Sequence, residues 1–140
     1  MAEKNKAEVI ATIRLDKIAE DSKNRRLPIL LVFSSATCPY CKLQEDEILK
    51  PMLISGDYDN KVIIRKVLIL EEPELIDFRG TTVSMDNFVD RYSVQVTPTI
   101  LFLDQNGKEL AQRLVGINTV EMFGRDVDGA IELSLKKLQN

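Results

Sequence analysis

Two cysteines lie three positions apart in the segment Cys38-Pro39-Tyr40-Cys41, and the chain of 140 residues contains no others. The apolar run Ile29–Phe33 precedes them and an amphipathic stretch follows, so the pattern places them where a buried strand gives way to a helix. Two thiols at this spacing can form a disulfide with little backbone movement. A thiol at the start of a helix also has a lowered pKa, because the helix dipole stabilises the thiolate.

The two thiols are expected to differ in role. Cys38, at the helix N-terminus with its sulfur exposed, would be the nucleophile, and Cys41, one turn inside, would resolve the mixed disulfide. Pro39 fits the first helical turn, since its missing N–H has no intrahelical partner there. Lys42 would assist thiolate formation, whereas the acidic residues at 45–47 would oppose it.

Two other interpretations of the dithiol remain open. The first is half of a zinc site, but a structural site takes four Cys or His ligands and the chain has two cysteines and no histidine, so only a site shared by two chains fits. The second is an inert structural disulfide, which would stabilise weakly because it closes a very short loop. The lack of histidine also excludes Ser-His and Cys-His catalytic pairs.

A second motif, Val96-Thr97-Pro98-Thr99, lies between a helical pattern and an apolar strand. A proline after a threonine at a strand entry is often an ordinary trans residue. Beside a dithiol motif at this spacing, a functional role for Pro98 is the favoured interpretation.

The remaining pattern predicts alternating helices and strands. Residues 7–23 carry apolar side chains at roughly helical spacing, although Val9–Leu15 is also consistent with a short strand. Pro51 should bend the helix that contains the dithiol, because it removes one backbone hydrogen bond. The other expected strands are 29–33, 61–70, 99–103 and 108–115. The other expected helices are 38–54, 85–92, which Ser84 can cap, and 117–138, which is interrupted near Gly124.

This order predicts an α/β fold in which a central mixed β-sheet is flanked by helices on both faces. The early crossovers imply parallel strands, and Asn106-Gly107 is a strong hairpin signal that adds an antiparallel edge. The segment Glu71–Val83 is longer than a normal connection and acidic at its start. It either recognises a partner or decorates an edge of the sheet, with Leu75 and Phe78 packed in a small cluster.

The two motifs together resemble the thioredoxin superfamily, over about Asp16 to Leu138. The resemblance implies a thiol-disulfide oxidoreductase in which the proline at Pro98 follows a cis peptide bond and faces the dithiol. It also implies that backbone groups of Thr97 pair with the extended chain of the substrate, while Pro39 and Tyr40 border the groove and tune the redox poise. More specifically, residues 77–80, 91–94, 97–99 and 107–109 resemble bacterial SoxW-type thioredoxins, which are exported to the periplasm.

The sequence departs from the thioredoxin pattern at three places. Thr37 stands where a tryptophan is usual, and the chain has no tryptophan. Pro-Tyr is the glutaredoxin dipeptide, but the glycine pair expected for glutathione binding is absent after the proline strand. Val32 occupies the position of a buried aspartate that moves protons at the resolving thiol; water or Glu45 would take that proton here, although Glu45 is also consistent with an ordinary solvated helix residue.

Composition limits the setting. The length favours one domain over residues 1–140, and the net charge of −3 gives no electrostatic support for binding nucleic acid or anionic membrane. No apolar run approaches a membrane span, and Met1–Ala7 has no hydrophobic signal segment. An even cysteine count suits an exported protein but does not decide the compartment. The SoxW-type resemblance implies a periplasmic protein, so we expect a periplasmic monomer whose leader is missing from this sequence, with a cytoplasmic location as the alternative.

The sequence therefore predicts a reductase of protein disulfides that an upstream thiol reductant recharges, with no cofactor motif such as G-x-G-x-x-G and no need for a metal. Two alternatives stay open. A disulfide oxidase or isomerase of the same fold differs only in the direction of electron flow. A non-catalytic binding module would keep the dithiol as a vestige and dock a partner on the acidic loop.

Overall fold

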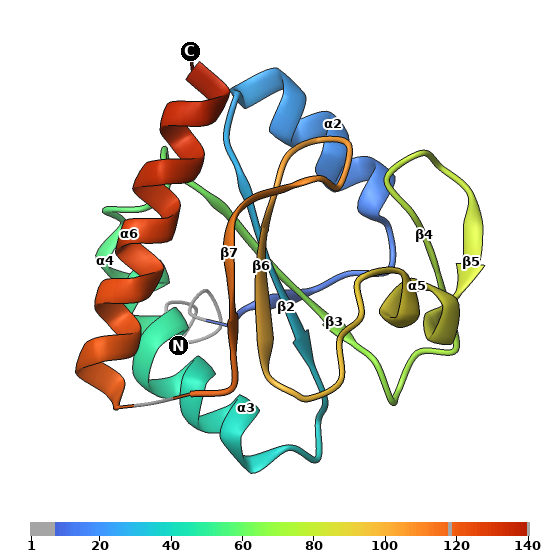
Figure 1. Ribbon diagram of the computed structural model, residues 1–140, viewed down its shortest axis with the longest axis horizontal. Helices are drawn as coiled ribbons and strands as arrows, with labels where there is room; N and C mark the ends of the chain where they lie inside the picture. The colour runs from blue at the N-terminus through green and yellow to red at the C-terminus, as the bar shows by residue number, and fades with distance from the viewer. Residues whose placement is uncertain (1–7, 118, 140) are drawn as a thin grey trace.

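The computed structural model describes residues 8–117 and 119–139, so the expectation about Met1–Ala7 falls outside the described residues. Its centre is a five-stranded sheet with the strand order β1-β3-β2-β6-β7 (Figure 1). β1, β3 and β2 run parallel to one another, and β6 and β7 add an antiparallel hairpin. The strands of this sheet are β1 (Ile10–Ala11), β2 (Ile29–Ser34), β3 (Ile63–Leu68), β6 (Thr99–Leu103) and β7 (Glu109–Val115).

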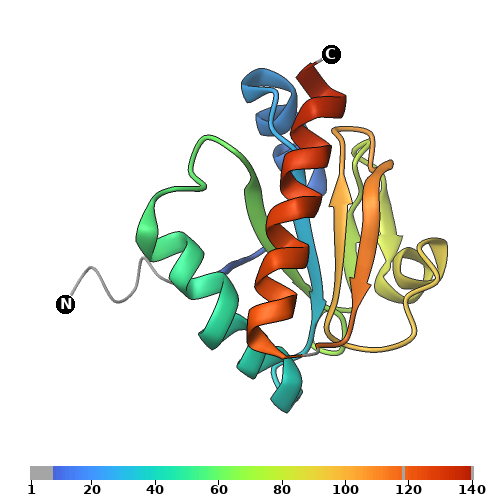
Figure 2. The same cartoon turned by 60° about the vertical axis from the view of Figure 1, so that its left-hand side comes forward.

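Helices cover both faces of the sheet, which confirms the predicted architecture. α2 (Leu15–Arg25) and α5 (Met85–Arg91) lie on one face. The other face carries α6 (Val120–Gln139) and the helix that follows the dithiol. Figure 2 shows the sheet between α6 on one side and α5 on the other.

Alternation along β2 divides the core into two clusters. Leu31 and Phe33 pack toward α2 and α5, whereas Leu30 and Val32 pack toward α6. Every residue of β2 is buried, as expected for a central strand whose apolar run is continuous. The dithiol therefore follows a fully buried central strand.

The N-terminal ambiguity is resolved in favour of a strand followed by a helix. β1 pairs with β3 through Ile10 and Ala11, and α2 begins only at Leu15. α2 ends where Arg26 adopts a left-handed conformation with φ of 56°, and its N–H bonds the carbonyl of Ser22.

The helix after the dithiol is continuous but changes type. It consists of α3 (Pro39–Gln44), the π-helical turn η1 (Glu45–Leu49) and α4 (Lys50–Ser55). Pro51 cannot donate a backbone hydrogen bond, and directly before it the N–H of Lys50 bonds the carbonyl of Glu45, five residues back. The helix thus has a π-helical turn on the N-terminal side of Pro51, and the bend at Pro51 stays a prediction.

The segment Glu71–Val83 is more ordered than a long connection. It contains β4 (Glu74–Ile76), which pairs antiparallel with β5 (Thr82–Ser84). Leu75 and Phe78 join the larger core cluster beneath α2 and α5, so the expectation of a small separate cluster is wrong. Their apolar side chains lie within reach of that core because the hairpin packs against α5.

Two further expectations concern the helices α5 and α6. The Ser84 side chain caps α5 by accepting a hydrogen bond from the amide of Asn87 at 3.1 Å, as predicted. The interruption predicted near Gly124 is wrong, because α6 runs unbroken from Val120 to Gln139. Burial of Phe123, Val127 and Ile131 holds this helix on the sheet and outweighs the weak helix propensity of its two glycines, Gly124 and Gly129.

Tyr92 gives a prediction about stability at high pH. Its hydroxyl donates to the carbonyl of Gly107 at 2.7 Å, and burial raises the pKa of this phenol to about 12. Because the folded state favours the protonated form, the stability from Tyr92 is present below pH 10 and is lost as the pH rises from 10 to 12. Urea unfolding at a series of pH values should show this decline, and a Tyr92→Phe variant should show a shallower one; parallel profiles would contradict the prediction.

None of the helices within residues 8–117 and 119–139 has the length and apolar character that a bilayer crossing requires.

Candidate active site

The dithiol lies where β2 ends and the following helix begins. Cys38 is the N-cap of α3, and its sulfur accepts a hydrogen bond from the amide of Cys41 at 3.2 Å. The two cysteines form a disulfide, with their Cα atoms 5.2 Å apart. Cys38 is partly exposed, whereas Cys41 is only 5% exposed. A reagent from solvent therefore reaches Cys38 first.

The second motif lies against the first cysteine. The Thr97–Pro98 peptide bond is cis, and Pro98 is buried at the entry to β6. The Thr97 hydroxyl lies 3.3 Å from the sulfur of Cys38, and its carbonyl oxygen lies 3.7 Å from the same atom. The two motifs that the sequence singled out are thus in direct contact.

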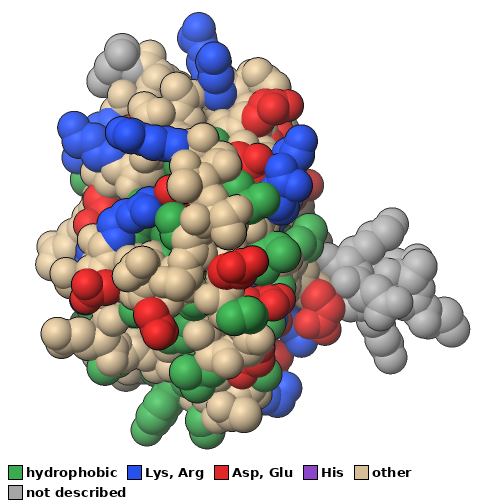
Figure 3. Space-filling model, turned by 90° about the vertical axis from the view of Figure 1, so that its right-hand side faces the viewer, with side chains coloured by type: hydrophobic (Ala, Val, Ile, Leu, Met, Phe, Trp, Pro, Cys, Tyr) green, Lys and Arg blue, Asp and Glu red, His purple; other side chains and the backbone are tan. Residues whose placement is uncertain are grey.

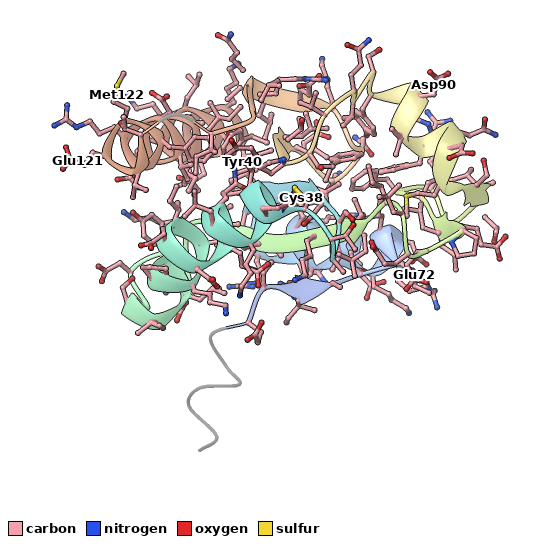
Figure 4. All side chains as sticks on the ribbon, turned by 90° about the horizontal axis from the view of Figure 1, so that it is seen from below. Cys38, Tyr40, Glu72, Asp90, Glu121 and Met122 are labelled. Carbon is pink, nitrogen blue, oxygen red and sulfur yellow. A yellow bond between two sulfur atoms is a disulfide. The ribbon has the colours of Figure 1, made fainter. Side chains whose placement is uncertain are left out.

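Apolar side chains are exposed near the dithiol. Tyr40 is 63% exposed, Val96 is 49% exposed and Met122 is 56% exposed. Seen from the dithiol end, Tyr40 lies beside Cys38 toward α6 and Met122, and Glu72 lies on the opposite side (Figure 4). Figure 3 shows the face that carries α5 and β5, with hydrophobic side chains at the bottom of the picture, which is the end of the molecule where the dithiol lies. This arrangement offers an apolar surface to a polypeptide that approaches Cys38.

An open cavity of about 280 Å³ lies beside Cys38 and Cys41 on the α6 side of the sheet. Glu45 and Lys66 both line it and form an ion pair of 2.9 Å, with side chains that are 15% and 19% exposed. Lys66 is the β3 partner of Val32, the buried apolar residue at the position of the aspartate in the thioredoxin pattern. The acid that pairs with Lys66 is Glu45, which lies on the helix one turn beyond Cys41.

A second ionic network covers the outer rim of the same cavity. Asp46 accepts from Lys50 and from Lys42, each at 3.1 Å, and these hydrogen bonds hold the pKa of Asp46 below its usual value. Lys42 is therefore engaged with Asp46, and its assistance to the Cys38 thiolate stays a prediction.

Two residues at the site were missed from the sequence. Lys66 and Arg65 are the two cations of the otherwise apolar strand β3, which is a weak signal for a buried ion pair. Glu71 accepts hydrogen bonds from the Ser35 hydroxyl and the Ala36 amide, both at 3.2 Å. Nothing in the local sequence links Glu71 to a loop thirty-five positions earlier, because the contact depends on the pairing of β2 with β3.

The comparisons with known proteins agree with this geometry. Residues 15–127 match the family described as Thioredoxin-like domain, and the chain belongs to that family. A comparison with curated proteins found no match.

Among the solved structures with the same fold are three that align with this chain over most of its length and most of their own. Thioredoxin NaTrxh from Nicotiana alata is 23% identical, with coverage of 88% of this chain and 92% of its own and a TM-score of 0.61. A structure entitled DsbH Oxidoreductase is 20% identical, with coverage of 91% and 88% and a TM-score of 0.62. Mitochondrial thioredoxin 3 from Saccharomyces cerevisiae is 15% identical, with coverage of 86% and 94% and a TM-score of 0.58. The family and the Cys38/Cys41 pair together define a thiol-disulfide oxidoreductase.

Proposed function

We propose that this protein reduces disulfides in other proteins, with Cys38 as the attacking thiol and Cys41 as the resolving thiol. The observation that carries the proposal is the asymmetry of the pair. Cys38 is partly exposed and caps the helix, whereas Cys41 is buried behind it. Only the first can reach a disulfide in a large substrate.

The proposed reaction has two exchange steps. The Cys38 thiolate attacks one sulfur of the substrate disulfide, forming a mixed disulfide, and the other substrate sulfur leaves as a thiolate that takes a proton. The Cys41 thiolate then attacks the Cys38 sulfur, releases the second substrate thiol and leaves the Cys38–Cys41 disulfide. A dithiol reductant from an upstream protein returns two electrons and two protons for the next turnover.

Four residues would form the substrate groove. Pro39 and Tyr40 follow Cys38 and are exposed, whereas Pro98 is buried and the Thr97 hydroxyl lies 3.3 Å from the Cys38 sulfur. Backbone groups of Thr97 would pair with the extended substrate chain, because its carbonyl lies only 3.7 Å from the sulfur that is attacked.

The direction of electron flow can be tested by equilibration of the dithiol with glutathione buffers. A reductase should give a midpoint near that of thioredoxin, about −270 mV. A value near about −120 mV, as in a strong oxidant such as DsbA, would assign the chain to the oxidase or isomerase alternative. An intermediate value above about −180 mV would also refute the reductase.

Glu45 is proposed to take the proton from Cys41 before the second exchange step. It is one helical turn beyond Cys41, lines the same cavity, and is paired with Lys66. In a Glu45→Gln variant, release of the substrate from the mixed disulfide should slow about tenfold at neutral pH, since general base catalysis contributes at least that much. Stopped-flow measurement of the two steps should show an unchanged attack by Cys38.

Glu47 provides the matched control, because it is an exposed acid on the same helix and does not line the dithiol cavity. Glu47→Gln should leave both steps unchanged. If Glu45→Gln released substrate as fast as the wild type, the proton would go directly to water.

The periplasmic location, the SoxW-type sub-family and the monomeric state stay predictions. Cell fractionation and the sequence upstream of Met1 test the location, and sedimentation of the purified protein tests the monomeric state.

A further inference from the structure

A hydrogen-bond chain links the segment after β3 to the loop that carries the dithiol. The carboxylate of Glu71 accepts from the Ser35 hydroxyl and from the Ala36 amide through the same oxygen, at 3.2 Å each. The Ser35 oxygen in turn accepts from the Thr37 amide at 3.3 Å and lies 3.2 Å from the Thr37 hydroxyl. One carboxylate thus orders three consecutive residues before Cys38.

The same loop sets the backbone of Cys38. The Cys38 amide donates to the carbonyl of Ser35 at 3.3 Å, which closes a turn over residues 35–38. This turn gives Cys38 its extended N-cap conformation, with φ of −98° and ψ of 110°, and places its sulfur over the Cys41 amide. Any rotation of the turn moves the sulfur relative to the helix axis.

Glu71 is well placed to hold the turn. The amide of Ile69 bonds the carbonyl of Ser34 at 3.0 Å, so the chain leaving β3 is fixed to the chain leaving β2 two residues before the carboxylate. Ser35 is only 5% exposed, and loss of its acceptor would leave its hydroxyl poorly satisfied.

We infer that Glu71 is a positioning residue for Cys38, which fixes the Ser35–Thr37 turn by hydrogen bonding and so keeps the nucleophilic sulfur aligned with the helix N-terminus. The inference rests on the proposed role of Cys38 as the attacking thiol. It assigns Glu71 a role through its oxygen as an acceptor and not through its charge, since a nearby carboxylate by itself disfavours a thiolate.

The test uses the reduced full chain and three variants. Glu71→Ala removes the acceptor and the charge, Glu71→Gln keeps an acceptor oxygen and removes the charge, and Glu72→Ala removes a neighbouring charge that makes no side-chain hydrogen bond to residues 8–117 or 119–139. The first readout is the rate of Cys38 alkylation by iodoacetamide as a function of pH. The second is the split between kcat and KM in the reduction of a protein disulfide.

Alignment of a charge with a helix terminus stabilises the charged form by an amount that changes the ratio of thiolate to thiol by about two- to fivefold. This factor sets the expected effect on Cys38. Glu71→Ala should slow alkylation at neutral pH about two- to fivefold, move the midpoint of the profile to higher pH and lower kcat by a similar factor. Glu71→Gln should restore near-wild-type behaviour. Glu72→Ala should leave the profile in place or move it to lower pH, so charge loss cannot account for an upward shift.

Three results would overturn the inference. These are an unchanged alkylation profile in Glu71→Ala, an equal impairment in Glu71→Gln, and an equal upward shift in Glu72→Ala. Should Glu71→Ala not fold, Glu71→Asp, which withdraws the oxygen by one methylene, and Ser35→Ala must show the same upward shift, and normal profiles in both would refute the role. Alkylation needs no protein substrate, so failure of the reductase proposal would appear separately. In that case Glu71→Ala would still shift the alkylation profile to higher pH, while the wild type would reduce no protein disulfide.

Discussion

A Cys38→Ser variant should lose reduction of protein disulfides by about 10³-fold or more, because a serine hydroxyl is not ionised at neutral pH and does not attack a disulfide sulfur. Cys38 is the only described thiol that a bulky substrate can approach, since Cys41 is almost completely buried. An insulin reduction assay with dithiothreitol measures the loss. Comparable turnover by the variant and the wild type would favour the non-catalytic binding module.

Cys41→Ser is the informative partner of this variant. Cys38 can still attack, but nothing inside the protein can displace the substrate, so a mixed disulfide should accumulate. Non-reducing electrophoresis followed by mass spectrometry should find that adduct on Cys38. An adduct on Cys41 in the Cys38→Ser variant would reverse the assigned roles.

Gly107→Ala should lower the free energy of unfolding more than a glycine-to-alanine change at any other glycine of this chain. Gly107 has φ of +79°, and a Cβ there would approach the Tyr92 hydroxyl at 2.5 Å and the Phe78 ring at 2.6 Å. Left-handed backbone costs about 1–2 kcal/mol and overpacking adds about 1–3 kcal/mol, so we expect a loss of about 3 kcal/mol in the free energy of unfolding. Urea unfolding measures it directly.

Gly80 offers a matched control. Its φ of +87° is similarly left-handed, but nothing lies within 4 Å of a Cβ at that position. Gly80→Ala should therefore lose only the backbone part, about 1–2 kcal/mol. Equal losses in the two variants would mean that Phe78 and Tyr92 move aside freely and that the packing under the hairpin is loose.

Local sequence signals predicted the parts of the fold that depend on short-range physics. The continuous apolar run of β2, the Ser84 cap of α5 and the Asn-Gly hairpin before β7 are each encoded within a few residues. The cysteine pair and Thr97-Pro98 were found for the same reason, since each is a compact motif. Their contact then follows from the antiparallel pairing of β2 with β6.

The parts that were missed depend on pairings between distant segments. Leu75 and Phe78 reach the main core only because the β4–β5 hairpin packs beside α5. The Glu45–Lys66 ion pair requires the register in which Lys66 lies opposite Val32. The Glu71 contacts with the dithiol loop likewise require β3 to end beside β2. The Glu45–Lys66 and Glu71–Ala36 contacts join residues 21 and 35 positions apart, so no short window of the sequence contains both partners.

The wide turn at η1 has a consequence for transplanting this dithiol. Each residue of an α-helix rotates the chain by about 100°, so a π-helical turn that holds one extra residue offsets the face of Cys41 and Glu45 from the face of Met52. Excision of one residue from Glu45–Leu49 would make the helix regular and would rotate Cys41 and Glu45 away from Lys66. A chimaera that borrows Cys38–Gln44 must therefore import the bulge as well, or its acid will point at the wrong strand.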